Sequence, residues 1–352
     1  MRSGKINSKY KNMMWAFISL ALAVLTVNTV LKQSRTMSFE DLLSALVSSD
    51  KQWLIPGIIF AALFVWFEGL AIRSILKDAG YKCSYQSGLL YSTSDVFFSA
   101  ITPSATGGQP ASAFFMYRKG IPAGVVSAVL VLNLMMYSVS VIILGIISIC
   151  VIPQSFLDFN TLSRVLIILG FVVLIGLSLF FLSILKKGTV IFDLLSRFIL
   201  FLNRKGIIRR TENRLQKIQK ISADYEKCSK LMAENNKMLI HALVWNLLQR
   251  ASQIVVPTFI YLSLGGNKSY AGLIFAKQCL ITIGYNFVPI PGAMGISDFL
   301  MIDGFTEIMG RETAFSSVMI SRGITFYTCV AICGIITLIG YLYGRKKNDR
   351  SL

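Results

Sequence analysis

The chain is poor in the residues that most catalytic and metal sites use. It has one histidine, His241, in 352 residues, so a histidine-rich metal site or a Ser-His-Asp hydrolase is poorly supported. Its six cysteines form no C-x-x-C pair and favour small hydrophobic core positions over a zinc site. No G-x-x-x-x-G-K-[ST] sequence is present, which argues against direct ATP use. We therefore expect no metal, no cofactor and no catalytic residue.

Long polar stretches are also scarce. The longest, residues 186–237, has about 50 residues, whereas a typical soluble domain has about 100 or more. Apolar residues make up 54% of the chain, and several runs reach the roughly 20 residues that a bilayer crossing needs. The sequence predicts an all-α integral membrane protein, organised as a single polytopic domain over residues 1–352.

Acidic residues are few, and the formal net charge is +18. The basic residues lie beside the apolar runs, where the positive-inside rule and anionic headgroups explain them. Nucleic acid is not expected as a partner, since no nucleic-acid-reading motif is present. We expect the protein in a bacterial-type cell membrane. The charge distribution predicts that both termini lie on the cytoplasmic side.

The apolar runs predict about six transmembrane helices. They cover residues 13–31, 53–76, 121–152, 164–185, 238–264 and 314–343. Two further apolar segments, 85–117 and 270–309, are interrupted by glycine and proline. The second arm of the first segment is about 14 Å long, too short for the roughly 30 Å hydrocarbon core. We interpret both segments as re-entrant hairpins.

The order of these segments predicts an inverted repeat. Span, hairpin and span over about 53–152 recur over about 238–343, with the first hairpin open to the cytoplasm and the second to the outside. Many secondary transporters share this architecture. A basic cytoplasmic linker, 186–237, joins the halves. Its residues 190–202 resemble an interfacial helix, and a second helix is expected to begin at Thr211.

The two interruptions are the candidate binding site. Proline and paired glycine over 102–110 and 288–295 cannot continue a helix, and in lipid such backbone is tolerated only where it lines a cavity or packs against protein. The helix should restart at about Gln109 and about Gly295, with free N–H groups pointing into the gap. A helix N-terminus attracts anions, so a phosphate is the expected guest.

Charged side chains at membrane depth extend this hypothesis. Such charges are costly and usually face a polar cavity. Arg250, Lys277 and Arg322 could complete a phosphate cradle, while Asp95 and Asp298 could contact an amine on the same headgroup. The predicted binding residues are Asp95, Thr106, Gly107, Gly108, Gln109, Arg250, Lys277, Pro291, Gly292, Gly295, Asp298 and Arg322. For Asn246 and Gln253, which share the helix face of Arg250, hydrogen bonding between helices is the alternative.

Both interruptions carry motifs that resemble a known family. Pro-x-x-x-Gly-Gly-Gln-Pro over 103–110 and Pro-x-Pro-Gly-x-x-Gly-x-x-Asp over 289–298 resemble the lysylphosphatidylglycerol synthase transmembrane family, which is flippase-like and includes the membrane half of the multiple peptide resistance factor. The family often has Glu where this chain has Gln109, Arg where it has Ser112, and Glu where it has Asp298. An arginine in the family's last span matches Arg322.

The resemblance implies translocation of a phospholipid, which could be lysyl-phosphatidylglycerol, and a link to resistance against cationic antimicrobial peptides. It also implies a phospholipid ligand, a separate lysyl-transfer synthase and a homodimer as candidate partners. Full-length relatives add a soluble aminoacyl-transfer domain that this chain lacks, so an enzyme is not favoured. Two alternatives stay open: a phosphatidylglycerol lysyltransferase, and an ion-coupled carrier of a small anionic solute.

Overall fold

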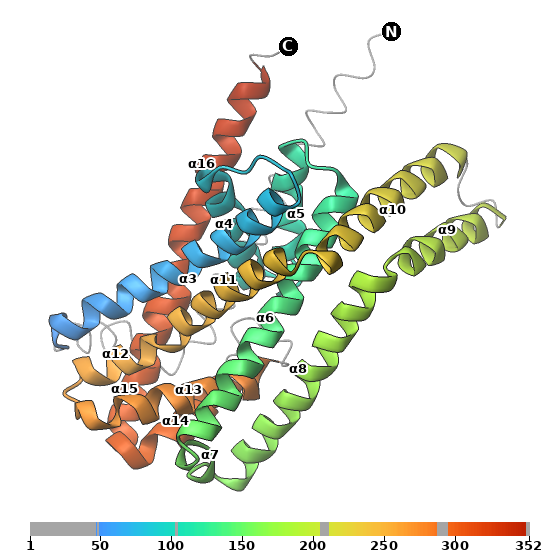
Figure 1. The fold of residues 1–352 in the computed structure, drawn as a ribbon. Helices are drawn as coiled ribbons and strands as arrows, with labels where there is room; N and C mark the ends of the chain where they lie inside the picture. Colours follow the sequence, from blue (N-terminus) through green and yellow to red (C-terminus); the bar gives the residue numbers. More distant parts are fainter. Residues whose placement is uncertain (1–46, 48, 103–104, 205–210, 287–294, 350–352) are drawn as a thin grey trace.

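A computed structural model describes residues 47, 49–102, 105–204, 211–286 and 295–349, and every regular element in these ranges is a helix (Figure 1). The absence of strands in the described ranges confirms the all-α fold. The expected first span, 13–31, lies outside the described residues. Residues 103–104 and 287–294, in the two interruptions, also lie outside them.

Within the part of the chain that the structure describes, four stretches of helix are long and apolar enough to cross a membrane. They are α3 (Lys51–Asp78), α6 (Ala123–Val151), α8 (Thr161–Lys187) and a continuous rod over Arg311–Tyr343. The rod comprises α15 (Arg311–Arg322), the π-helical turn η5 (Gly323–Thr328) and α16 (Cys329–Asp349). These four match predicted spans and establish a multi-pass membrane protein.

The predicted span 238–264 has a different form. It consists of α11 (Asn236–Ile254) and α12 (Val256–Ser263), which meet at Val255. Pro257 lies in the first turn of α12, where its missing N–H is tolerated. This pair is not among the four apolar stretches, because α11 carries several polar and charged side chains.

Both interrupted segments form broken helix pairs, as predicted. The first pair is α4 (Tyr85–Ile101) and α5 (Gly108–Arg118), and the second is α13 (Ala271–Asn286) and α14 (Ile296–Met309). The two members of each pair pack against each other. The helices restart within one residue of the predicted positions. The depth of the pairs in a bilayer, and therefore their re-entrant character, stays a prediction.

The first broken pair packs closely on α3. A Cβ on Gly69 of α3 would lie 2.9 Å from the carbonyl oxygen of Gly88 on α4, so the two backbones touch at this point. α11 also packs on α3, and it contacts α6 as well. The polar side chains of α3, α4 and α11 are therefore brought together in the middle of the molecule.

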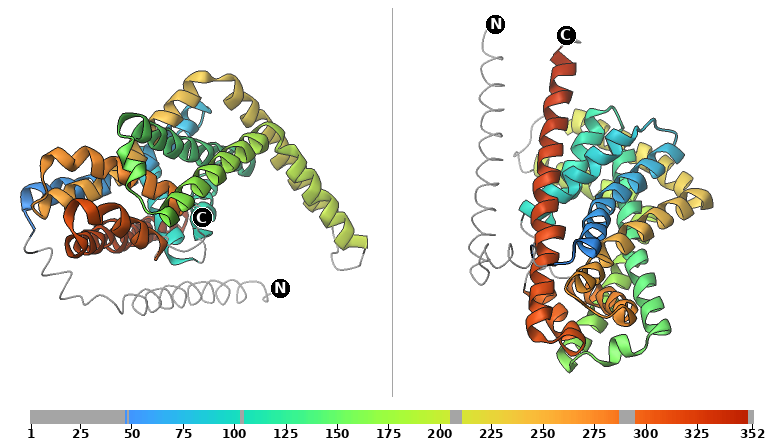
Figure 2. Two further views of the ribbon diagram at one scale, coloured as in Figure 1. Left: turned by 90° about the horizontal axis from the view of Figure 1, so that it is seen from below. Right: turned by 90° about the vertical axis from the view of Figure 1, so that its left-hand side faces the viewer.

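The linker between the halves forms an arm of two helices, α9 (Thr189–Arg204) and α10 (Thr211–Glu234), which projects from the body (Figure 2). α10 packs on α6, and the Tyr225 hydroxyl donates to the Ile184 carbonyl, 2.9 Å away. Burial raises the pKa of Tyr225 to about 12, which keeps this donor protonated. α9 buries no residue fully, and its apolar side chains stay exposed, as expected for an interfacial helix.

Two short helices complete the described chain. They are α7 (Gln154–Leu157), between α6 and α8, and the 3-10 turn η3 (Lys268–Tyr270), before α13. Asp158, which ends α7, lies close to α13, and this contact matters for one predicted site residue below.

Candidate functional site: a buried polar centre between the broken helix pairs

Arg250 of α11 is the centre of the site. Its side chain is only 7% exposed, and its guanidinium lies over the rings of Tyr137, at 4.2 Å, and Phe64, at 4.9 Å. Nη1 donates to the side-chain oxygen of Gln253 at 2.7 Å, but the buried Nε has no hydrogen-bond partner among the described residues. A buried donor without a partner costs about 1–3 kcal/mol. Arg250 therefore keeps one buried N–H donor that the described residues do not satisfy.

At the first interruption, the protein's own carboxylate occupies the start of α5. Asp95 of α4 accepts hydrogen bonds from Gln109 Nε2 at 2.6 Å and from Ser99 Oγ at 3.0 Å. A Cβ on Gly108 would lie 2.1 Å from the Asp95 carboxylate, so only glycine allows this contact. Asp95, Gly108 and Gln109 therefore lie together as predicted, but the anion at this helix end is Asp95.

The remaining predicted residues of the first interruption support the turn. The Gly107 amide donates to the Thr102 hydroxyl at 2.8 Å, which closes the loop onto the end of α4. Ala105 has a φ of 53°, in the left-handed region that favours glycine. Thr106 is exposed. These residues shape the break, and none of them places a buried polar group toward Arg250.

The second interruption also has a carboxylate at the start of its second helix. Gly295, with a φ of 88°, precedes α14, and its amide donates to Asp298 Oδ2 at 3.0 Å. Arg322 of α15 donates through Nε to Asp298 Oδ1 and through Nη2 to the Ser297 hydroxyl at 2.6 Å. The Asp298 carboxylate thus caps the start of α14, and Arg322 holds it there. At the start of α5, by contrast, Asp95 binds a side chain and no backbone amide. Pro291 and Gly292, two further predicted site residues, lie outside the described residues.

The surroundings of Arg250 reach the second interruption. The Tyr137 hydroxyl, next to the guanidinium, donates to Asn286 Oδ1 at 2.8 Å, and Asn286 is the last residue of α13. The polar centre is therefore continuous from α11 across α6 to the end of α13.

The polar side chains of α11 differ in their contacts. Asn246 donates to Asn133 of α6 at 3.0 Å. It therefore makes the hydrogen bond between helices that was the alternative to a binding role. Gln249 is 2% exposed, and its side-chain oxygen has no hydrogen-bond partner among the described residues. Glu68 of α3, 7% exposed, is a second buried acidic side chain besides Asp95.

Lys277 lies in a different part of the molecule. It is fully buried on α13, and its Nζ is 3.2 Å from Asp158 Oδ2 at the end of α7. The Phe159 ring lies 5.4 Å from the same ammonium. Lys277 precedes the end of α13 by nine residues, or about 13 Å of helix. The structure thus gives Lys277 a partner of its own and does not bring it to the phosphate cradle of the sequence hypothesis.

This placement leads to a prediction for Lys277. Asp158→Asn is expected to lower the free energy of unfolding by about 3 kcal/mol, because it leaves the ammonium of the fully buried Lys277 without a counter-ion. Adding Lys277→Met should restore most of that loss, because the buried charge is then removed as well. Thermal unfolding of the purified variants tests this, and a double variant no more stable than Asp158→Asn alone would contradict it.

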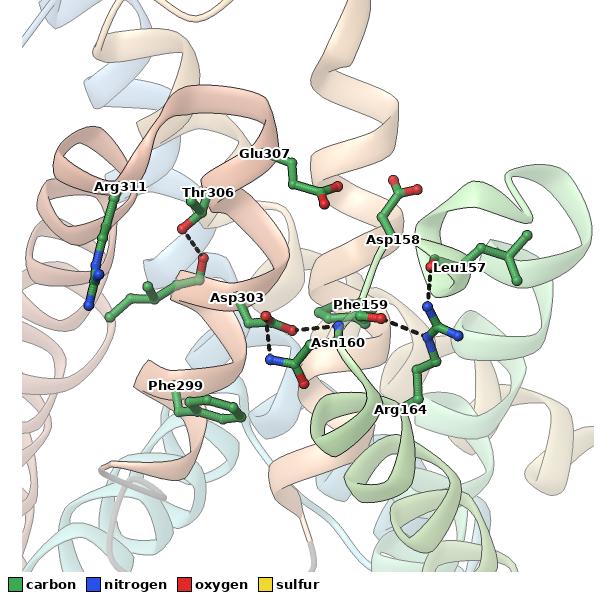
Figure 3. A pocket seen from close by; sticks show the side chains of 11 residues that line it. Leu157, Asp158, Phe159, Asn160, Arg164, Phe299, Asp303, Thr306, Glu307 and Arg311 are labelled. Atoms are coloured by element: carbon green, nitrogen blue, oxygen red, sulfur yellow. Dashed lines mark hydrogen bonds between the residues drawn. The ribbon is translucent and has the colours of Figure 1, made fainter.

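A groove of about 800 Å³ lies beside Asp158, between the start of α8 and α14 (Figure 3). Most of its polar groups already have partners: Asp303 accepts from the Asn160 amide and side chain, and Arg164 donates to the carbonyls of Leu157 and Phe159. None of the predicted binding residues lines it. We therefore place the candidate site at Arg250.

Arg322 holds the start of α14, and this contact can be measured. Removing it through Arg322→Ala is expected to lower the free energy of unfolding by about 2–3 kcal/mol, because two donors to the first turn of α14 are lost. Asp298→Asn should cost less, and the double variant should lose less than the sum. Additive losses in thermal unfolding would show that the pair does not act as a unit.

Several residues of the centre were not among the predicted binding residues. Glu68 was detectable in the sequence as a carboxylate inside an apolar run, and Gln249 as a member of the polar face of α11. Tyr137 and Asn286 gave no such signal, because a tyrosine and an asparagine within apolar helices are ordinary. Only the packing of α6 against α13 reveals them.

The fold and the site define a multi-pass helical membrane protein with a buried polar centre between two broken helix pairs. A family model described as the lysylphosphatidylglycerol synthase TM region matches residues 16–333. The chain belongs to this family. A UPF0104 membrane protein of Pyrococcus horikoshii is 22% identical over 334 residues, covering 90% of this chain and 96% of that relative.

Proposed function

We propose that the protein is a lipid translocase that moves the phosphate-bearing headgroup of an anionic phospholipid past Arg250. The observation that carries this proposal is the buried Nε of Arg250, which lacks a hydrogen-bond partner among the described residues. A phosphate oxygen is a strong acceptor for a guanidinium, and such a contact is shorter and stronger than a neutral hydrogen bond. Membership of a lipid-related membrane family supports a lipid as the source of that phosphate.

The helix breaks give the headgroup a polar route. We infer that residues 53–152 and 238–343 form an inverted repeat whose two broken pairs meet near the bilayer centre. In hydrocarbon, a phosphate needs polar partners at each step. Arg250, Tyr137 and Asn286 supply them between the two interruptions. The acyl chains stay in the bilayer, so only the headgroup has to enter the protein.

The finer assignments belong to this proposal. We propose lysyl-phosphatidylglycerol as one substrate, with the lipid supplied by a separate synthase, and protection against cationic antimicrobial peptides as the result. The protein would act in the cell membrane with both termini in the cytoplasm, and a homodimer is the proposed assembly. The family name supports a lipid-related role, and the apolar helices support a place in a membrane.

Leaflet exchange in proteoliposomes that contain only this protein tests the function. Tail-labelled phosphatidylglycerol and its lysyl form are each exposed to an impermeant quencher. In empty vesicles about half of the label is protected, and with active protein most of it should become accessible. Incorporation of labelled lysine into lipid would instead support the lysyltransferase. Uptake of a small anion without lipid exchange would support the solute carrier.

A further inference from the structure

Helix α9, in the arm between the two halves, carries an apolar face that the described residues leave uncovered. Large apolar side chains share one side of this helix and are all exposed: Val190, Ile191, Leu194, Leu195 and Phe198. Phe192 lies on the other side and packs on Tyr225 of α10, with ring centroids 5.5 Å apart. The apolar face of α9 is therefore turned away from α10. A continuous exposed apolar surface of this kind marks a place of contact with a partner or a membrane.

Close contacts hold the beginning of α9 beside the end of α8. α8 ends at Lys187, and α9 begins two residues later at Thr189. A Cβ on Gly188, between them, would lie 2.2 Å from the ring of Tyr225, so the junction packs tightly on α10. The Tyr225 hydroxyl also donates to the Ile184 carbonyl of α8, and α10 packs on α6. The apolar face of α9 therefore starts where a helix long and apolar enough to cross the membrane ends.

Continuity and charge together identify the partner of this face as a lipid surface. α8 exposes large apolar side chains along its length, and the apolar face of α9 continues that surface beyond the end of α8. Lys186 and Lys187 are the last two residues of α8. Arg197 and Arg204 of α9 are exposed and lie two turns apart beside the apolar face. Apolar side chains bordered by basic ones suit the headgroup region of a negatively charged leaflet.

We propose that α9 is a docking surface for anionic lipids: its apolar face enters the headgroup region of one leaflet, and Arg197 and Arg204 bind negatively charged headgroups there. By the positive-inside rule this is the cytoplasmic leaflet. The contact is separate from the one at Arg250 and does not depend on lipid translocation. An amphipathic helix alone would bind a neutral surface as well, whereas the two arginines make docking depend on the charge of the lipid.

Hydrogen–deuterium exchange of the full chain in lipid nanodiscs, with one copy per disc, tests the docking. Amides of residues 189–204 should exchange about tenfold more slowly in discs of phosphatidylcholine with phosphatidylglycerol than in discs of phosphatidylcholine alone, because each arginine near an anionic surface favours docking by about fivefold. Salt at about 1 M, where the Debye length is about 3 Å, should remove most of this difference. Arg250→Gln should leave it unchanged, because the two lipid contacts are separate.

A matched pair of substitutions in α9 shows whether one face is responsible. Leu194, 68% exposed, lies on the apolar face, whereas Leu200, 42% exposed, lies on the polar side of the same helix. Leu194→Asn should speed exchange in the anionic discs by about tenfold, and Leu200→Asn should not. Arg197→Gln combined with Arg204→Gln should remove the dependence on phosphatidylglycerol. All four side chains are exposed, so these variants should fold.

Three results would overturn the docking surface. The first is equal exchange of wild-type α9 in both kinds of disc, and the second is an equal effect of Leu194→Asn and Leu200→Asn. The third is protection that appears only in discs with two copies, which would assign the apolar face to contact between chains. None of these results bears on leaflet exchange through Arg250, so the two proposals fail separately.

Discussion

Arg250→Gln is expected to weaken binding of phosphatidylglycerol by about 10–100-fold. The guanidinium is buried, its Nε lacks a partner among the described residues, and hydrogen bonds to a charged group contribute about 1.5–3 kcal/mol. Glutamine keeps a polar side chain but is shorter, and it removes the charge and the forked donors. Lipid retained by the detergent-purified protein, measured by native mass spectrometry over a titration, gives the affinity.

The matched control is Arg164→Gln. Arg164 donates to loop carbonyls at the start of α8 and lines the groove near α14, outside the polar centre. This variant should bind phosphatidylglycerol like wild type. Equal weakening by both substitutions would mean that the lipid responds to net charge, and the assignment of Arg250 as the phosphate ligand would fail.

Gly108→Leu is expected to separate α5 from α4 and to abolish lipid exchange. A Cβ at this position would lie 2.0 Å from Ser99 Oγ and 2.7 Å from the backbone oxygen of Asp95. The serine can rotate, but the backbone of α4 cannot move without breaking its helix. Overpacking of this kind costs about 1–3 kcal/mol and sometimes more. We expect a lower unfolding midpoint, together with loss of exchange in the fraction that still inserts.

Gly176→Leu provides the comparison within the same chain. Gly176 lies in α8, and a Cβ there would meet no atom within 4 Å. Replacing a helical glycine in open space should be neutral or add up to about 1 kcal/mol through helix propensity. Exchange and thermal midpoint should both match wild type. Full activity of Gly108→Leu in inserted protein would show that the close contact between α4 and α5 is not needed.

Much of the fold was predictable because a helix that crosses a membrane needs a long apolar run, which can be found directly in the sequence. Apolar length alone located α3, α6, α8 and the rod from α15 to α16, and glycine with proline located both broken pairs. The division of the span at Val255 was not predicted, since Pro257 has no flanking glycine or polar run to mark a break. The predicted helix from Thr211 was confirmed, because its buried face repeats with regular helical spacing.

The candidate site was only partly predictable. Arg250 and Asp95 were singled out because charged side chains are rare at membrane depth, and Gln109 because the helix was expected to restart there. The sequence could not show that Asp95 would bind Gln109 at the start of α5, or that Asp298 would cap α14. Because of these contacts we moved the expected phosphate from the helix ends to Arg250. Nor could it show that Lys277 pairs with Asp158, since that contact depends on how the loop after α7 packs on α13.

The central claim is that a lipid headgroup reaches the buried guanidinium of Arg250. Photo-crosslinking with p-benzoylphenylalanine in place of Phe64, whose ring lies 4.9 Å from that group, tests it most directly in phosphatidylglycerol membranes. The same probe in place of Val172, an exposed residue of α8, provides the comparison. We predict headgroup adducts at position 64 and acyl-chain adducts at position 172. Acyl-chain adducts alone, or no lipid adduct, at position 64 would contradict the account.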